Sequence, residues 1–173
     1  LRPEAKAAML STLDCVGNPS SVHAEGRRAR AIVETAREQV AALVGAEPAE
    51  VVFTSGATEA NAWAMAGGWG TILRSGIEHD SVLAPAKASG AGLVELPAGR
   101  DGIVEVEAPA PLHGRALVSL QMANNETGVM QPVAEVAGRA RSKGFAVHTD
   151  AVQAAGRVAI DFAALGVDYL SLS

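Results

Sequence analysis

One segment of the sequence is suited to bind an anion of the size of a phosphate. At residues 55–58, Ser-Gly-Ala-Thr, small side chains join a predicted strand to a predicted helix. Backbone N–H groups and the Thr58 hydroxyl can therefore approach a phosphate, which the helix dipole favours. The segment has neither the lysine of a P-loop nor the full glycine pattern of a dinucleotide-binding turn. Taken by itself, it is more often an ordinary capped turn.

Three further polar groups follow predicted strands. His79 comes after Glu78, where a neutral imidazole can stack on a flat ligand or move protons, although a lone histidine is more often structural. Asn125 lies in a polar run at 124–126 that a turn also explains. Asp150 ends a buried strand, with Gln153 close behind, and a carboxylate there must face a cation or strong donors. Together these residues indicate a planar ligand with a phosphate, a protonated ring nitrogen and a phenolic oxygen.

Other catalytic chemistries find little support. The single cysteine and four scattered histidines form no pair at zinc-ligand spacing, so we expect no metal site. No Gly-x-Ser-x-Gly word marks a hydrolase nucleophile. Cys15 has no neighbour in sequence that would lower its thiol pKa, so we interpret it as an ordinary, at least partly buried thiol.

Composition indicates one soluble globular unit. The chain has 173 residues, of which 49% are hydrophobic and 19% charged, enough apolar material for a core. With a net charge of −5 and one basic group, at 27–30, that a solvated helix face explains, we expect no nucleic-acid partner. No apolar run approaches the roughly 18 residues of a membrane span, and no leader peptide precedes the chain, so we expect no membrane association. A lone cysteine also favours the cytoplasm.

Helical and strand patterns alternate along the chain. Apolar residues recur every three or four positions over 24–44, before a stop at Gly45. Further helices are predicted at 3–13, 60–66, 81–89 and 132–143. Strands are predicted at 51–54, 71–73, 93–96, 116–121, 145–149 and 167–172, and the proline-containing segment 107–111 is predicted to be a loop.

This alternation predicts an α/β fold, a mostly parallel sheet with helices on both faces. In such a sheet, ligands bind beyond the carboxyl ends of the strands. The polar groups described above lie at those ends, so the fold itself is expected to gather them.

Five sequence words, in order, carry a family resemblance. They are Gly-Asn-Pro-Ser-Ser-Val-His at 17–23, Val-Phe-Thr-Ser-Gly-Ala-Thr-Glu-Ala-Asn at 52–61, Glu-His-Asp-Ser-Val-Leu at 78–83, Asn-Asn-Glu-Thr-Gly at 124–128 and His-Thr-Asp-Ala-Val-Gln at 148–153. With these words the chain resembles the cysteine desulfurases, within the class V aminotransferase group of fold-type I pyridoxal-phosphate enzymes. The likeness runs over residues 1–173.

The resemblance implies a role for each candidate residue. Ala57 and Thr58 would hold the phosphate of pyridoxal 5'-phosphate, with a hydroxyl added by Ser173. His79 would stack on the pyridine ring as a catalytic residue, and Asp150 would pair with the ring N–H. For the remaining contacts, Gln153 would hydrogen-bond the phenolic oxygen, and Asn125 would lie between that oxygen and the substrate carboxylate.

The implied reaction converts L-cysteine to L-alanine and passes the sulfur to an enzyme cysteine as a persulfide. The family's opening strand, its Schiff-base lysine, which follows a serine matched by Ser173, its catalytic cysteine and its C-terminal small domain have no counterpart here. Residues 1–173 are thus expected to be part of a large cofactor-binding domain, inactive alone. Cys15 matches no catalytic position.

Several alternatives remain open. A selenocysteine lyase or another class V aminotransferase would share the cofactor residues, and a non-catalytic binding or scaffold protein could retain the fold. The resemblance further implies a homodimer and a sulfur-acceptor protein, with iron–sulfur cluster assembly among the pathways served.

Overall fold

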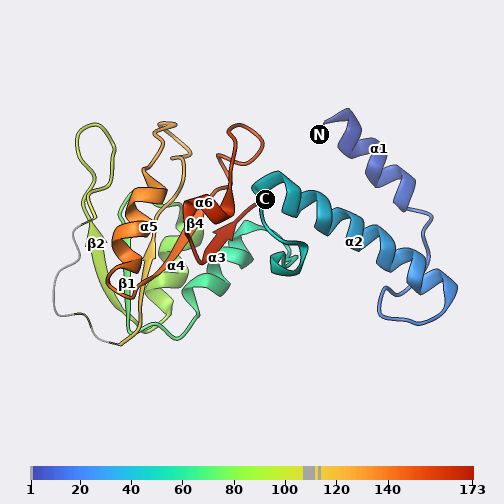
Figure 1. Cartoon of the computed structure of the whole chain (residues 1–173), viewed down its shortest axis with the longest axis horizontal. Coiled ribbons are helices and arrows are strands. Elements are labelled where there is room, and N and C mark those ends of the chain that lie inside the picture. Colours follow the sequence, from blue (N-terminus) through green and yellow to red (C-terminus); the bar gives the residue numbers. More distant parts are fainter. Residues whose placement is uncertain (1, 107–111, 113) are drawn as a thin grey trace. The chain divides into compact units, whose positions relative to one another are not determined.

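A computed structural model describes residues 2–106, 112 and 114–173 (Figure 1). The chain divides into two compact units. The first comprises Leu1–Ala42 and Glu47–Val51, and the second comprises Leu43–Ala46 and Val52–Ser173. The predicted loop at 107–111 lies outside the described residues.

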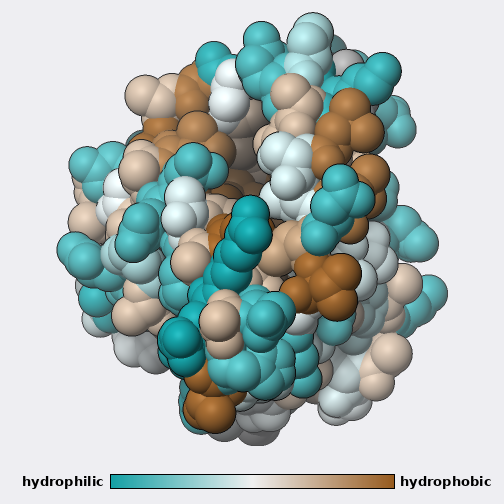
Figure 2. Space-filling view, turned by 90° about the vertical axis from the view of Figure 1, so that its right-hand side faces the viewer, coloured by the Kyte–Doolittle hydropathy of each residue, from teal (hydrophilic) through white to brown (hydrophobic). Residues whose placement is uncertain are grey.

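The first unit is helical. It contains α1 (Pro3–Thr12), most of α2 (Ala24–Val44) and the short 3-10 helix η1 (Pro48–Glu50). Proline at the first position of α1 has the fixed backbone angle that starts a helix well. No residue of α1 is buried, and Met9 and Leu10 are exposed. In the space-filling view, apolar residues likewise lie at the surface among hydrophilic ones (Figure 2).

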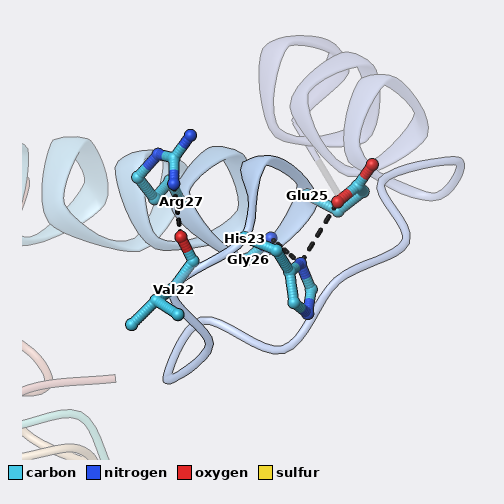
Figure 3. A network of polar contacts seen from close by, with 5 residues as sticks. All are labelled: Val22, His23, Glu25, Gly26 and Arg27. Atoms are coloured by element: carbon cyan, nitrogen blue, oxygen red, sulfur yellow. Dashed lines mark hydrogen bonds and ion pairs between the residues drawn. The ribbon is translucent and has the colours of Figure 1, made fainter.

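The loop before α2 folds closely onto the first turn of that helix (Figure 3). The imidazole Nδ1 of His23 accepts a hydrogen bond from the Gly26 N–H, at 3.3 Å, and lies 3.2 Å from the Glu25 carboxylate. The guanidinium of Arg27 donates to the Val22 carbonyl (Figure 3). The His23 side chain thus provides a partner for one of the backbone N–H groups at the start of α2, which have none within the helix.

The second unit contains a five-stranded parallel sheet. Its elements are α3 (Ala57–Met65), β1 (Thr71–Ser75), α4 (Asp80–Ala88), β2 (Gly92–Leu96), β3 (Ala116–Ser119), α5 (Val133–Arg141), β4 (Ala146–Asp150), α6 (Phe162–Leu165) and β5 (Tyr169–Ser171). The strand order is β2-β1-β3-β4-β5, and every neighbouring pair is parallel. The predicted α/β fold with a parallel sheet is confirmed.

Both faces of this sheet are covered (Figure 1). Ile72 and Leu117 pack with apolar residues of α3 and α4 on one face. Leu73 and Val118, the next residues along the same strands, pack with those of α5 on the other. Successive strand side chains point to opposite faces, so a strand covered on both sides is apolar throughout.

Some predicted elements differ from the structure. Residues 51–54 form no strand, because β-branched residues become a strand only where a neighbouring strand pairs with them. The carbonyl of Val51 accepts from Arg37 instead, and Val52 is exposed. Helix α3 begins three residues earlier than predicted, at Ala57, and β5 is limited to three residues. The four-residue α6 was not predicted, since one helical turn has no periodicity to detect.

Within the described residues, no helix is both long and apolar enough to cross a membrane.

Candidate functional site

The order of strands determines where a ligand can enter. From β1 the chain crosses to β2 on one side and then returns to β3 on the other side of β1. The two crossovers leave the sheet in opposite directions, which opens a crevice at the carboxyl ends of β1 and β3. Polar residues that follow these strands and β4 are therefore brought to one place.

A cavity of about 290 Å³ lies at this edge. All seven residues nominated from the sequence line it, namely Ala57, Thr58, His79, Asn125, Asp150, Gln153 and Ser173. Five neighbours complete the lining, namely Gly56, Ser81, Gln121, Ala123 and Val152. The volume is close to the roughly 300 Å³ at which small-molecule sites begin.

One end of the cavity is the amino terminus of α3. Gly56 precedes the helix without a side-chain hydrogen bond to its first turn. Apart from its two chain neighbours, no described residue has an atom within 4 Å of the position a Gly56 Cβ would occupy. The loop is held from outside: Thr54 Oγ1 donates to the Gly56 carbonyl at 2.9 Å, and the Glu59 carboxylate accepts from the Ser55 N–H at 2.6 Å. The latter bond keeps the pKa of Glu59 below its usual value. The N–H groups at the start of α3 therefore remain available to an anion.

A buried carboxylate faces the same cavity. Asp150, at the end of β4, accepts hydrogen bonds from Asn61 Nδ2 at 2.8 Å and from the Val152 N–H at 3.0 Å. Two neutral donors do not neutralise a charge that has been removed from water. The arrangement consequently favours a cationic group of a ligand beside Asp150.

The imidazole of His79 has a fixed proton arrangement. Its Nδ1 accepts from the Ser81 N–H at 3.1 Å and lies 2.8 Å from the Ser81 hydroxyl. A nitrogen that accepts a backbone N–H bond carries no proton, so the hydrogen is assigned to Nε2. The same bond makes His79 the N-cap residue of α4, which ties its position to the end of β1.

Adjacent asparagines after β3 have different tasks. Asn124 Oδ1 accepts from the N–H groups of Glu126 and Thr127, and its Nδ2 donates to the Ile77 carbonyl. Turn formation therefore explains Asn124. Asn125 is exposed and lines the cavity, so its amide is free to face a ligand.

Gln153 is oriented by a neighbouring arginine. The guanidinium of Arg157 donates to Gln153 Oε1 and to the Gln153 carbonyl, both at 2.7 Å. Because the oxygen is occupied, the Nε2 group is the end of the side chain that can donate to an oxygen of a ligand.

Glu78 is a buried acid beside the site. Its Oε1 accepts from the Gln121 N–H at 3.0 Å and from the Ser75 hydroxyl at 3.3 Å, while Oε2 has no partner among the described residues. Burial raises the pKa of Glu78 to about 8, and the negative charge of Asp150 acts in the same direction. Glu78 is therefore mainly protonated at neutral pH and adds little negative charge.

Sequence reasoning overlooked Asn61 and Ser81. Asn61 is completely buried in α3 and hydrogen-bonds both Ser81 and Asp150. Its signal was an asparagine, a poor helix former, within a run of alanines in a predicted helix. Among the residues that the structure covers, no cluster of histidine, cysteine, aspartate and glutamate could hold a metal ion.

The profile of the aminotransferase class-V family matches residues 5–173. The chain belongs to this family. Among curated relatives, the protein named cysteine desulfurase IscS of Dictyoglomus turgidum is 38% identical to this chain over 186 residues. The alignment covers 100% of this chain and 47% of that protein. The chain thus spans about half the length of the curated relatives it matches.

Solved structures of class V relatives agree. A NifS-like protein from Rickettsia africae superposes with a TM-score of 0.91 at 32% identity, over 100% of this chain and 51% of that one. A structure described as SspA in complex with cysteine gives the same TM-score at 30% identity, over 100% of this chain and 54% of that one. At these identities the likeness covers sequence as well as fold, over the whole of this chain and about half of each relative.

Proposed function

We propose that the protein containing this chain is a pyridoxal-phosphate-dependent cysteine desulfurase. It converts L-cysteine to L-alanine and passes the sulfur to an enzyme cysteine as a persulfide. The observation that carries the proposal is the single cavity lined by all seven residues that the family resemblance assigned to the cofactor. Relatives named cysteine desulfurase, and the related structure described as a complex with cysteine, support the choice of substrate.

The donor set fits this cofactor. The uncapped amino terminus of α3, with open space beside Gly56, suits a phosphate. The buried Asp150 suits a protonated ring nitrogen, and the Nε2 group of Gln153 suits a phenolic oxygen. Three different groups of one planar molecule thus each have a partner of the right chemistry in the same cavity.

Each of the seven nominated residues then has a definite role. Ala57, Thr58 and Ser173 bind the phosphate. His79 stacks on the ring, and Asp150 keeps a proton on the ring nitrogen, since a carboxylate favours the protonated state of a group beside it. Pyridoxal phosphate, when bound, supplies an acceptor for the electrons released as bonds to the substrate Cα break.

The remaining assignments concern binding of substrate. Gln153 would donate to the phenolic oxygen through Nε2, because its own side-chain oxygen is bound by Arg157. Asn125, which lines the cavity, would lie between the phenolic oxygen and the substrate carboxylate and orient the amino acid. The sulfur is received by a cysteine that we place outside this chain.

The test compares three reactions of the full-length protein loaded with pyridoxal phosphate. With a thiol present to reduce the persulfide, release of sulfide and alanine from L-cysteine is expected to exceed selenide release from L-selenocysteine and amino transfer to a keto acid. Preference for selenocysteine, or for amino transfer, would replace the proposal with a selenocysteine lyase or another class V aminotransferase. Absence of cofactor uptake and of all three reactions would favour a binding or scaffold protein.

We further propose that residues 1–173 are part of a larger cofactor-binding domain, because the chain spans about half of its relatives. Reading the gene beyond the codon for Ser173 tests this: a following His-Lys pair supports it, and a stop codon contradicts it. We also propose that the protein is cytoplasmic, forms a homodimer and passes its sulfur to an acceptor protein in iron–sulfur cluster assembly. Light scattering of the full-length protein tests the homodimer, and pull-down of persulfide-accepting proteins tests the acceptor.

A further inference from the structure

One buried amide links two residues that line the cavity, Ser81 and Asp150. Asn61 lies on α3 and is 0% exposed. Its Nδ2 group lies 2.8 Å from Asp150 Oδ2 and 2.9 Å from Ser81 Oγ. The NH₂ group has two hydrogens, so it can donate to both oxygens at once.

The chemistry of the partners fixes the orientation of this amide. If the amide were reversed, its oxygen would face the carboxylate of Asp150, and two acceptors would meet in a buried place. The observed orientation leaves Asn61 Oδ1 buried without a partner among the described residues. A hydrogen bond to a charged acceptor stabilises the protein more than a bond between neutral groups, so this orientation of the Asn61 amide is the more stable one.

The Ser81 hydroxyl continues the connection. Because it accepts from Asn61, its own hydrogen is directed to His79 Nδ1, 2.8 Å away. Hydrogen bonds therefore run from Asn61 to Asp150 on one side, and from Asn61 through Ser81 to His79 on the other. Asn61 is completely buried, so water does not compete for its amide hydrogens.

We infer that Asn61 is a positioning residue that sets, through one amide, both the carboxylate of Asp150 and the imidazole of His79. The inference deepens the proposed function, on which it rests for the roles of these two residues. It links the group beside the ring nitrogen to the group that stacks on the ring, so the two are oriented together. Asn61 itself does not line the cavity and acts only through its neighbours.

The test uses the full-length protein and two readouts. Asn61→Leu keeps the approximate volume of the side chain and removes both donors. Loss of a charge-assisted hydrogen bond predicts an increase of about tenfold or more in the Kd for pyridoxal phosphate, measured by quenching of tryptophan fluorescence. In the cofactor-free protein, the ¹⁵N resonance of His79 Nδ1 is expected to shift, because without Asn61 the Ser81 hydroxyl no longer has to direct its hydrogen to Nδ1. The Ser81 N–H bond remains and keeps the ring hydrogen on Nε2.

Matched variants separate positioning from stability. Ser81→Ala interrupts the branch to His79, so it should change the His79 resonances while raising the Kd less than Asn61→Leu does. The double variant should add little to the His79 change of either single one, because both interrupt the same path. Ala64→Gly weakens the same helix without touching the hydrogen bonds, and should leave the His79 resonances unchanged.

Either of two results would overturn the inference: His79 resonances and cofactor affinity like those of the wild type in Asn61→Leu, or equal changes in Asn61→Leu and Ala64→Gly. Failure of the wild-type protein to bind pyridoxal phosphate would instead refute the proposed function. The ¹⁵N measurement would still decide whether Asn61 orients His79, because it needs no cofactor.

Discussion

The imidazole Nε2 of His148 lies 3.0 Å from the hydroxyl of Ser171 on the neighbouring strand. Its Nδ1 lies 2.9 Å from the hydroxyl of Ser119, so one buried ring joins β3, β4 and β5. Burial lowers the pKa of His148 to about 4, although the charge of Asp150 acts in the opposite direction. The ring is therefore neutral at neutral pH, with one nitrogen donating and the other accepting.

Replacement of His148 by Phe should lower the free energy of unfolding by about 2–4 kcal/mol at pH 7.5, since two buried hydroxyls lose their partner. The pKa in the folded state lies below the unfolded value of 6.5, so this stabilisation is present above pH 6.5 and is lost as pH falls through about 4. Urea unfolding at pH 4 to 8 should show the difference between the two proteins shrinking in acid. An equally large difference at every pH would contradict the neutral ring, and His23→Phe is the exposed control.

The contribution of Glu78 to the free energy of unfolding should depend on pH in the opposite direction to that of His148. Burial raises its pKa from 4.5 to about 8, so its stabilisation is full below pH 4.5 and is lost as pH rises through 8. Glu78→Gln removes the titration and keeps an oxygen for the Gln121 N–H. Relative to the wild type, the variant should gain stability between pH 5 and pH 9, by about 1.4 kcal/mol for each unit of pKa shift.

Urea unfolding at pH 5, 7 and 9 measures this gain, with Glu135→Gln as the control, because the side chain of Glu135 is 60% exposed and pairs with Arg139 on the surface. Parallel pH curves for the wild type and Glu78→Gln would show that Glu78 ionises normally in the folded protein.

Topology explains which parts of the site the sequence predicts. Asp150 ends one strand of the parallel sheet, His79 follows another, and Thr58 lies in the first turn of a helix at the same edge, so correct strand order alone brings them together. Asn61 escapes such reasoning, because its task depends on how α3 packs over the end of β4, a contact between residues 89 apart. The predicted strand at 51–54 is wrong for a related reason: propensity describes a segment, whereas a strand also requires a partner.

Because Arg157 orients Gln153, we expect loss of Arg157 to weaken cofactor binding without destabilising the fold. In Arg157→Ala the oxygen of Gln153 loses its donor, and the amide can turn either end towards the ligand. We expect the Kd for pyridoxal phosphate to rise by about three- to tenfold with little change in stability, because an exposed pair contributes little to folding. Arg139→Ala is the matched control, since Arg139 also bonds a residue four positions earlier on the surface. Equal affinities in the two variants would show that Gln153 needs no orientation.

Position 26 requires glycine, because the backbone of the preceding loop lies too close to leave room for a Cβ. A Cβ built there would lie 2.6 Å from the Asn18 carbonyl oxygen and 2.7 Å from that of Ser21. Gly26→Ala should therefore displace the loop at 17–23 and increase hydrogen–deuterium exchange there and in the first turn of α2. Gly138→Ala, inside α5 with open space around it, is the control and should slightly stabilise the protein. Unchanged exchange in Gly26→Ala would show that the loop does not depend on this contact.

The carboxylate of Asp150 should matter more to chemistry than to folding. Asp150→Ala leaves a protonated ring nitrogen without an anionic partner, and loss of one such electrostatic group costs about a hundredfold or more in rate. With a thiol present to reduce the persulfide, the full-length variant should release sulfide from L-cysteine at least that much more slowly, with near-native circular dichroism. Asp101→Ala, whose carboxylate is exposed and bonds only the Ile103 N–H among the described residues, should retain full activity. Undiminished sulfide release from Asp150→Ala would refute the role at the ring nitrogen, because no other carboxylate lines the cavity in the described part of the chain.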